Sequence, residues 1–270
     1  MRPLFRWAGS KRKILPYIKK YFPQNHNRYF EPFCGSACLY FDTRPQQATL
    51  SDMNSELIHA YLMVRDTPIQ VHNFLSGLAV NPDEYKRIRS LDERNLAPHE
   101  RAGRFIYLNK LCFNGVYRTN LQGRFNVPMG VKTGSIPTLD ELLAYSTALK
   151  SVELLTGDFQ TIVDRAAEGD FIYLDPPYSK PESRNRGEYG PNSFDYGDIQ
   201  RLVDSLKSAE QRGTSFILSY CESDSLLKSI PSDWLVENLS VRRHVAGFHQ
   251  HRRVVPELLI YNHQTKAREI

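Results

Sequence analysis

The amino-acid sequence predicts an α/β protein built on a mostly parallel, doubly wound β-sheet. Two observations support this prediction: short apolar runs alternate with segments of helical periodicity, and residue types that bind ligands directly follow several of these runs. The expected strands are residues 29–30, 48–50, 152–155, 171–174, 215–218, 234–236 and 258–261. The expected helices are residues 11–21, 36–41, 54–64, 69–77, 82–94, 99–111, 138–149, 196–212 and 223–229.

The alternation of strands and helices is interrupted between residues 54 and 146. This interval is mainly helical and then becomes rich in Gly, Asn and Pro from Asn114 to Pro137. We therefore interpret residues 54–146 as an inserted second domain, and residues 1–53 and 147–270 as the domain that holds the sheet. A chain of 270 residues is long enough for one large core with a smaller insertion.

Composition excludes several classes of protein. The hydrophobic and charged fractions, 41% and 24%, are those of a soluble globular protein. We find no apolar run that could cross a membrane and no secretory signal, so we expect a cytoplasmic protein. Cys34, Cys38, Cys112 and Cys221 form no C-x-x-C pair, which argues against a zinc site and a disulfide framework and favours buried free thiols.

Positive charge is concentrated in two stretches of the chain. Residues 84–132 hold ten Lys or Arg against four acids, and residues 242–253 hold four Arg and three His with no acid. Such stretches suit a phosphate backbone, although composition alone fits a solvated basic surface equally well. Because the first stretch falls within residues 54–146, we expect the inserted domain to grip the substrate.

The segment Asp175-Pro176-Pro177-Tyr178 directly follows the apolar run of residues 171–174. It places an acid, two prolines that end the strand and an aromatic ring where open α/β sheets bind their ligands. A carboxylate and a backbone carbonyl, each accepting one N–H bond, would help the delocalised amine of a nucleobase to attack, and Tyr178 could stack on a base turned out of a helix. The alternative is an ordinary strand end with a Pro-Pro turn and a surface acid.

A second segment, Phe30-Glu31-Pro32-Phe33-Cys34-Gly35-Ser36-Ala37, follows an early strand and opens a helix. Its small residues would let the backbone approach a ligand closely, although it lacks the complete G-x-G-x-x-G pattern of dinucleotide-binding folds. Asp52 ends the next strand, where an acid can hold the two hydroxyls of a ribose. Asp52 could equally well cap the helix that begins near Asn54.

Together these segments resemble the DNA adenine methyltransferase (Dam) family, including its phage members, over essentially the whole chain. Trp7-Ala8-Gly9-Ser10-Lys11 is similar to the amino-terminal motif of that family, residues 33–35 to its cofactor loop, and residues 175–178 to its catalytic tetrapeptide. Residues 107–110, 114–120 and 123–130 are similar to its target-recognition hairpin, and residues 257–262 to its closing strand.

The resemblance implies an enzyme that transfers a methyl group from S-adenosylmethionine to N6 of adenine in duplex DNA, within GATC, by turning the base out and direct displacement. It implies a Rossmann-like methyltransferase fold whose seven-stranded sheet is mostly parallel with an antiparallel last strand. The implied catalytic residues are Asp175, Pro176, Pro177 and Tyr178. The implied cofactor contacts are Trp7, Lys11, Phe33, Gly35, Asp52, Asp158 and Asp175. The implied DNA contacts are Phe113, Asn114, Val116, Arg118, Asn120, Arg124 and Pro128.

Some positions depart from the family pattern. Ser10 and Ala37 stand where glycines are usual, and Gln122 and Arg124 differ from residues often seen in the recognition hairpin. The resemblance implies no metal and no obligate protein partner, and we expect a monomer. Whether a restriction endonuclease accompanies the protein is left open.

Other functions remain as alternatives. They are a methyltransferase acting on N4 of cytosine or on adenine in RNA, a catalytically silent DNA-binding module, and a nicotinamide-dependent oxidoreductase. Asp175 favours adenine, and the hairpin favours duplex DNA. The incomplete glycine pattern argues against the oxidoreductase, and the absence of a Pro-Cys pair disfavours methylation at C5 of cytosine.

Overall fold

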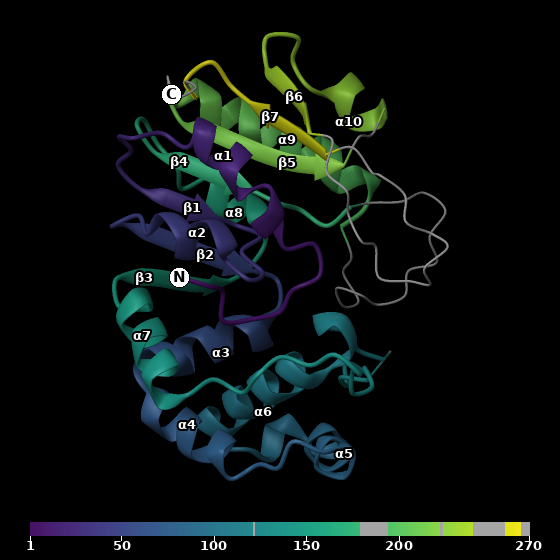
Figure 1. Cartoon of the computed structure of the whole chain (residues 1–270). Coiled ribbons are helices and arrows are strands. Elements are labelled where there is room, and N and C mark those ends of the chain that lie inside the picture. Colours follow the sequence, from purple (N-terminus) through teal and green to yellow (C-terminus); the bar gives the residue numbers. More distant parts are fainter. Residues whose placement is uncertain (121, 179–193, 222–223, 240–256, 266–270) are drawn as a thin grey trace.

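The central feature of the protein is a seven-stranded β-sheet (Figure 1). The computed structural model describes residues 1–120, 122–178, 194–221, 224–239 and 257–265, and the structural statements concern these residues. The strands are β1 (Tyr29–Glu31), β2 (Ala48–Asp52), β3 (Val152–Thr156), β4 (Phe171–Leu174), β5 (Ser215–Cys221), β6 (Leu235–Leu239) and β7 (Glu257–Tyr261). Their order is β3-β2-β1-β4-β5-β7-β6, and only β7 runs antiparallel to its neighbours, which confirms the predicted fold class.

Side chains of the central strands alternate between two apolar layers. On β4, Phe171 and Tyr173 join one cluster of buried side chains, whereas Ile172 and Leu174 join the other. This alternation follows from the two-residue period of a strand. Because helices cover both faces, the central strands are apolar throughout, and this is why they were recognisable as short apolar runs.

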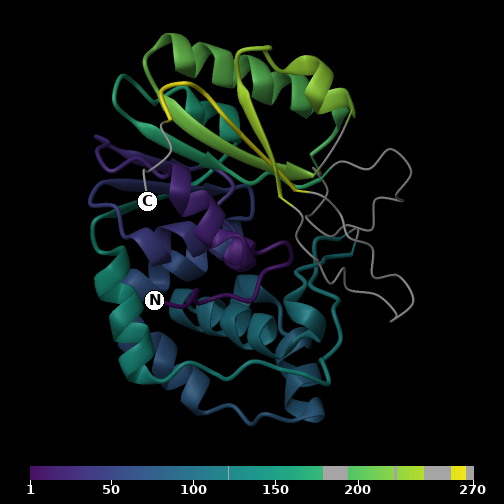
Figure 2. The same ribbon diagram turned by 45° about the horizontal axis from the view of Figure 1, so that its top comes forward.

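Helices cover both faces of the sheet. One face carries α8 (Phe159–Val163), α9 (Tyr196–Gln211) and α10 (Asp224–Ser229). The other carries α1 (Leu15–Tyr21), which follows the short turn η1 (Lys11–Lys13), and α2 (Cys38–Thr43). Figure 2 shows the sheet between α9 and α1.

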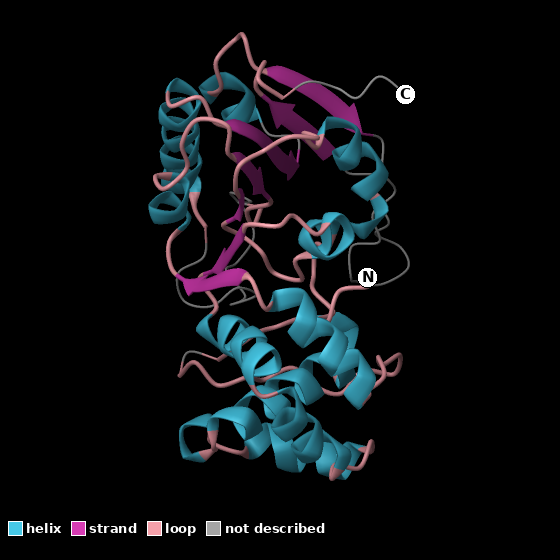
Figure 3. Ribbon diagram, turned by 90° about the vertical axis from the view of Figure 1, so that its left-hand side faces the viewer, coloured by secondary structure: helices cyan, strands magenta, loops and turns pink. Residues whose placement is uncertain are grey.

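A helical segment lies between β2 and β3. It contains α3 (Ser55–Asp66), α4 (Pro68–Ser76), α5 (Pro82–Ser90), η2 (Glu93–Asn95), α6 (Pro98–Leu111), η3 (Phe113–Gly115) and α7 (Leu139–Leu149). Figures 1 and 3 show it beyond the β3 edge of the sheet. Pro68, Pro82 and Pro98 open three of its helices, where the missing N–H costs no intrahelical bond. Thr138 opens α7 as part of a capping box with Glu141.

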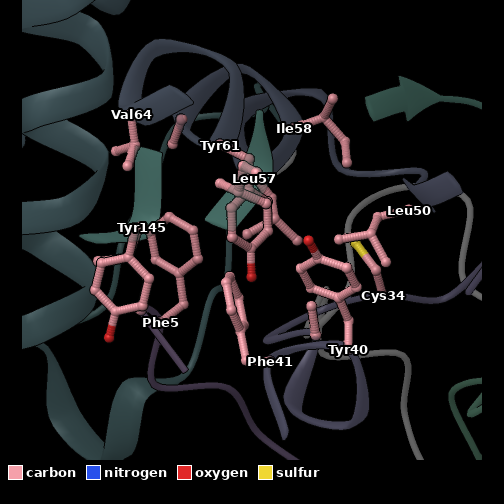
Figure 4. Close-up of a cluster of buried hydrophobic side chains, with 14 of the residues drawn as sticks. Phe5, Cys34, Tyr40, Phe41, Leu50, Leu57, Ile58, Tyr61, Val64 and Tyr145 are labelled. Carbon is pink, nitrogen blue, oxygen red and sulfur yellow. The ribbon is translucent and has the colours of Figure 1, made fainter. Parts of the chain in front are cut away.

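The helical segment and the sheet share one hydrophobic core. Figure 4 shows Phe41 of α2 near Tyr61 of α3 and Tyr145 of α7, and its ring centroid lies 6.2 Å and 5.5 Å from theirs. Leu50 of β2 and Phe5 belong to the same cluster. The first and last helices of the segment therefore pack on the layer that also covers one face of the sheet.

The structure differs from the expected elements in three places. The expected helix at 82–94 is divided into α5 and η2, because Leu91 is extended and Asp92 caps a new turn. The expected helix at 11–21 is likewise divided into η1 and α1. Helix α8 was not predicted, since five residues are too few to show a helical period. The basic stretch at 242–253 lies outside the described residues.

Candidate active site

Four parallel strands end on the same side of the sheet, and the predicted ligand-binding residues lie at these carboxyl ends. The glycine loop (residues 32–37) follows β1, Asp52 ends β2, Asp158 follows β3 and Asp175 follows β4. Strands β2 and β3 lie on one side of β1 in the sheet, and β4 and β5 lie on its other side, so the strand order reverses between β1 and β4. The glycine loop and Asp175 therefore flank the switch point where open α/β sheets bind ligands.

Asp175 lies at this edge with a partly exposed carboxylate. Its side chain is 20% exposed, and Oδ1 accepts a charged hydrogen bond from Nζ of Lys11 in η1. The Lys11 side chain is only 2% exposed, and its Nζ also lies 3.4 Å from Oε1 of Glu257. One buried cation is thus shared by two carboxylates, which offsets the cost of removing these charges from water.

Tyr178 is held at both ends of its side chain. Its hydroxyl donates to Oε1 of Glu257 at 3.1 Å, and its ring meets that of Tyr220 edge-on at 5.2 Å. Nζ of Lys11 lies 5.1 Å from the centroid of the Tyr178 ring. Pro176 and Pro177 join this tyrosine to Asp175, and their fixed φ angles restrict the spacing of the two side chains.

The glycine loop has a backbone that requires glycine at position 35. Gly35 has φ +45°, and a Cβ there would lie 2.7 Å from the indole of Trp7. Its N–H donates to Oδ2 of Asp52 at 3.0 Å, while Oδ1 accepts from the N–H of Asn54 at 2.9 Å. Burial raises the pKa of the Asp52 carboxyl. Asn54, not Asp52, caps α3, so the capping alternative for Asp52 is wrong.

Ala37 also adopts the left-handed conformation, with φ 49°. A glycine is usual at this position of the family pattern, and the backbone shows why. An L-residue in this conformation costs about 1–2 kcal/mol, which a small side chain at a buried helix start tolerates.

Trp7 connects the glycine loop to the hairpin of the helical segment. Its indole stacks on Tyr117 with a centroid distance of 6.2 Å and an interplanar angle of 17°. The preceding residue, Arg6, donates to the carbonyls of Lys110 and Cys112 at 2.9 Å and 3.2 Å. The amino-terminal segment therefore joins the site to the base of the hairpin.

Phe33 of the glycine loop packs on α8, the helix that Asp158 caps. The Phe33 ring stacks on Phe159 at 5.3 Å and meets Phe194 edge-on at 5.9 Å. Asp158 caps α8 and accepts two hydrogen bonds from Arg201, at 2.8 Å and 2.9 Å. This bidentate pair fixes the Asp158 carboxylate beside the loop.

The hairpin segment (residues 112–130) projects from the carboxyl end of α6. Two isolated antiparallel bridges hold it, Cys112 with Met129 and Thr119 with Phe125, and the N–H of Phe113 donates to the carbonyl of Pro128 at 2.9 Å. Phe113 is 48% exposed, and the next residue has φ 55°. The predicted contact residues Phe113, Asn114, Val116, Arg118, Asn120, Arg124 and Pro128 all lie on this one segment.

Two polar side chains organise the hairpin segment internally. Nε of Arg118 donates to Oδ1 of Asn126 at 2.8 Å, which orients the guanidinium. Oδ1 of Asn120 accepts from the N–H groups of Gln122 and Arg124, each at 3.0 Å, and so closes the turn. The departures from the family pattern at Gln122 and Arg124 therefore fall in a turn fixed by Asn120.

Comparisons with known proteins decide the family. Residues 7–246 match the D12 class N6 adenine-specific DNA methyltransferase family. The chain belongs to this family. The methyltransferase is 33% identical over 273 residues to type II methyltransferase M1.LlaDCHI of Lactococcus lactis subsp. cremoris, covering 97% of this chain and 96% of that protein. It is 30% identical to the DNA adenine methylase of Haemophilus influenzae, covering 96% and 92%. It is 31% identical to the DNA N-6-adenine-methyltransferase of Escherichia phage P1, covering 96% of this chain but 35% of that protein.

Three of the four cysteines of the methyltransferase are poorly suited to act as nucleophiles. Cys34, Cys38 and Cys112 are buried and free. Burial raises the pKa of the Cys38 thiol to about 12 and that of the Cys112 thiol to about 11. A thiol must ionise to attack, so these groups do not favour covalent catalysis.

A buried acid directly precedes the glycine loop of the methyltransferase. Glu31, at the end of β1, is 2% exposed and accepts a hydrogen bond from the Tyr29 hydroxyl at 2.6 Å. The pKa of Glu31 is raised to about 8, chiefly by burial and also by the negative charge of Asp175. Glu31 is therefore mostly protonated at neutral pH.

The described residues of the methyltransferase contain no group of three or more His, Cys, Asp or Glu that could hold a metal ion. Within the same residues, no helix is long and apolar enough to span a membrane.

Three side chains at the site were not expected from the sequence: Glu257, Ser219 and Arg201. Glu257 is the one charged residue in an otherwise apolar strand, which was a usable signal. It lies opposite Cys221 of β5, and Ser219 donates to its Oε1. Arg201 carries no such signal, because its partner Asp158 is 43 residues away in the sequence.

Proposed function

We propose that this DNA adenine methyltransferase transfers a methyl group from S-adenosylmethionine to N6 of an adenine turned out of duplex DNA, and that its recognition sequence is GATC. The observation that carries the proposal is the position of Asp175, at the carboxyl end of β4 beside the glycine loop and Lys11. An acid at the switch point of a parallel sheet can lie between a cofactor bound at the loop after one strand and a base bound at the loop after the neighbouring strand.

The residues around the glycine loop fit S-adenosylmethionine. The loop backbone approaches the Trp7 indole so closely that only glycine fits at position 35. Asp52 supplies a carboxylate for a ribose, Asp158 a second fixed carboxylate, and Phe33 an aromatic face. When bound, the cofactor supplies an activated methyl group on a sulfonium.

Asp175 and Tyr178 would position the adenine. The Asp175 carboxylate accepts one N–H of the amine, which draws the nitrogen lone pair out of the ring conjugation and toward the methyl group. Lys11 engages Oδ1 of that carboxylate and so holds it at the end of β4. The Tyr178 ring, fixed by Glu257 and Tyr220, offers a surface on which a turned-out base can stack.

Residues 54–146 would serve as the DNA-binding domain. Their hairpin segment carries an exposed aromatic ring at Phe113 and an oriented guanidinium at Arg118. Trp7 stacks on this segment at Tyr117 and contacts the glycine loop, so the same contact supports both halves of the site.

A transfer assay tests the function as a whole. Labelled cofactor is offered in parallel with duplex DNA, RNA and protein, and the methylated nucleoside is identified. We expect N6-methyladenine in duplex DNA. Label in N4-methylcytosine, in RNA or in no substrate would contradict the proposal.

Replacing Asp52 with asparagine is expected to weaken cofactor binding by about ten- to a hundredfold, because a hydrogen bond to a charged acceptor contributes about 1.5–3 kcal/mol. Calorimetry with S-adenosylmethionine measures this, and duplex affinity without cofactor should stay within about twofold. Asp42→Asn is the control, because Asp42 pairs with Lys19 at the surface. Equal cofactor affinity in the Asp52 variant and wild type would show that the pocket is misplaced.

Replacing Arg118 with alanine is expected to relax the requirement for guanine in GATC. In the described part of the chain its two terminal nitrogens have no protein acceptor, which leaves them able to form a bidentate contact to guanine that contributes about 1–3 kcal/mol of discrimination. Methylation mapping on random-sequence DNA measures the preference.

Arg124→Ala provides the comparison for Arg118, because it removes an exposed arginine from the same hairpin segment. If Arg124 contacts a phosphate, its replacement would weaken binding to all sequences alike and lower the salt dependence of binding. A preferred site other than GATC, or a uniform loss for Arg118→Ala, would contradict the specificity assignment.

A further inference from the structure

Glu257 and Asp175 contact the same lysine, Lys11, although they are distant in sequence. Strand β7 runs antiparallel to β5, so its first residue reaches the edge at which the parallel strands end (Figure 1). Glu257 is 1% exposed. Its carboxylate contacts groups from three elements: the hydroxyl of Ser219 on β5, the hydroxyl of Tyr178 after β4, and Nζ of Lys11 in η1.

The shared lysine links the two carboxylates electrostatically. Nζ of Lys11 bonds to Asp175 and lies 3.4 Å from Glu257, and all three side chains are removed from water to a large extent. If Glu257 were neutral, it would no longer share the charge of Lys11 with Asp175. Asp175 would then be a weaker acceptor for the amine N–H, because a hydrogen bond to a carboxylate weakens as a cation neutralises it.

Glu257 also fixes the aromatic ring of the site. Its Oε1 accepts from the Tyr178 hydroxyl at 3.1 Å, while Tyr220 packs against the ring at 5.2 Å. Loss of the acceptor would remove this hydrogen bond from the hydroxyl end of the ring. Glu257 would then no longer help to fix the position of the Tyr178 ring relative to Asp175.

We propose that Glu257 is a positioning residue for methyl transfer, which acts by dividing the charge of Lys11 between two carboxylates and by holding the Tyr178 hydroxyl. This inference rests on the proposed role of Asp175 in the reaction. Glu257 is buried and reaches the site through Lys11 and Tyr178. Its effect is therefore expected on the rate of transfer within the assembled complex rather than on assembly of that complex.

The test compares Glu257→Gln with wild type in single-turnover reactions, with enzyme and S-adenosylmethionine in saturating excess over a GATC duplex. Glutamine keeps the size and an acceptor oxygen but removes the charge. We expect the transfer rate to fall about ten- to a hundredfold, with cofactor and duplex dissociation constants within about threefold of wild type. A single-turnover rate reports only complexes that have formed, so a smaller folded fraction does not lower it.

Three further variants separate the possible explanations. Glu237→Gln changes an acid on the neighbouring strand β6 and should leave the rate within about twofold. Glu257→Asp should restore part of the rate lost in Glu257→Gln, because it restores the charge. Tyr178→Phe combined with Glu257→Gln should cost less than the product of the two single effects, because the hydrogen bond that Glu257→Gln weakens is already absent in Tyr178→Phe.

The outcomes distinguish this inference from the function on which it rests. A normal rate for Glu257→Gln alongside an inactive Asp175→Ala would overturn the role of Glu257 alone. A normal rate for Asp175→Ala would overturn the proposed function itself. Weaker substrate binding with an unchanged transfer rate would show that Glu257 has a purely structural role.

Discussion

Replacing Asp175 with alanine is expected to lower methyl transfer by about two to three orders of magnitude while leaving the fold and duplex binding intact. The variant removes the acceptor for the attacking amine, a contact most needed in the transition state. The fold should persist because Lys11 keeps Glu257 as a partner, so no buried cation is left without a counter-charge.

The measurement is the single-turnover rate together with duplex affinity and the midpoint of thermal unfolding. Asp175→Asn serves as the companion variant, because it keeps the size and an acceptor oxygen but not the charge. We expect it to retain more activity than alanine and less than wild type. Activity of Asp175→Ala within a few-fold of wild type would refute the assignment of this residue.

Replacing Phe41 with alanine is expected to lower the free energy of unfolding by about 3–5 kcal/mol. Phe41 is fully buried, and its ring contacts Tyr61 of α3 and Tyr145 of α7. The cavity would open between the sheet layer and the first and last helices of the helical segment. We therefore expect one cooperative unfolding transition at lower denaturant, with both parts of the protein unfolding together.

Denaturant unfolding followed by far-ultraviolet circular dichroism and by intrinsic fluorescence measures this effect. Phe113→Ala is the matched control, since it makes the same truncation on a half-exposed ring and should change stability by about 0.5 kcal/mol or less. Two separated transitions for wild type, or a loss under about 1 kcal/mol for Phe41→Ala, would show that the core is not shared in this way.

The sheet, its parallel character and the position of Asp175 at a strand end were predictable from local sequence patterns. These features depend on local patterns: an apolar run such as residues 171–174 and the prolines that stop it are written in adjacent residues. The glycine loop and Asp52 were found for the same reason, since each follows its own strand directly. The short helix α8 escaped because five residues cannot show a period.

The side chains that meet at the site come from segments far apart in the sequence, and their contacts could not be predicted from it. Lys11 and Asp175 are 164 residues apart, and Tyr178 and Glu257 are 79 apart. Their contacts arise from the strand order and from the reversed direction of β7, which brings Glu257 to the edge where β4 ends. No local pattern encodes such a pairing, because it depends on how separate elements pack around a common core and not on the propensity of any one of them.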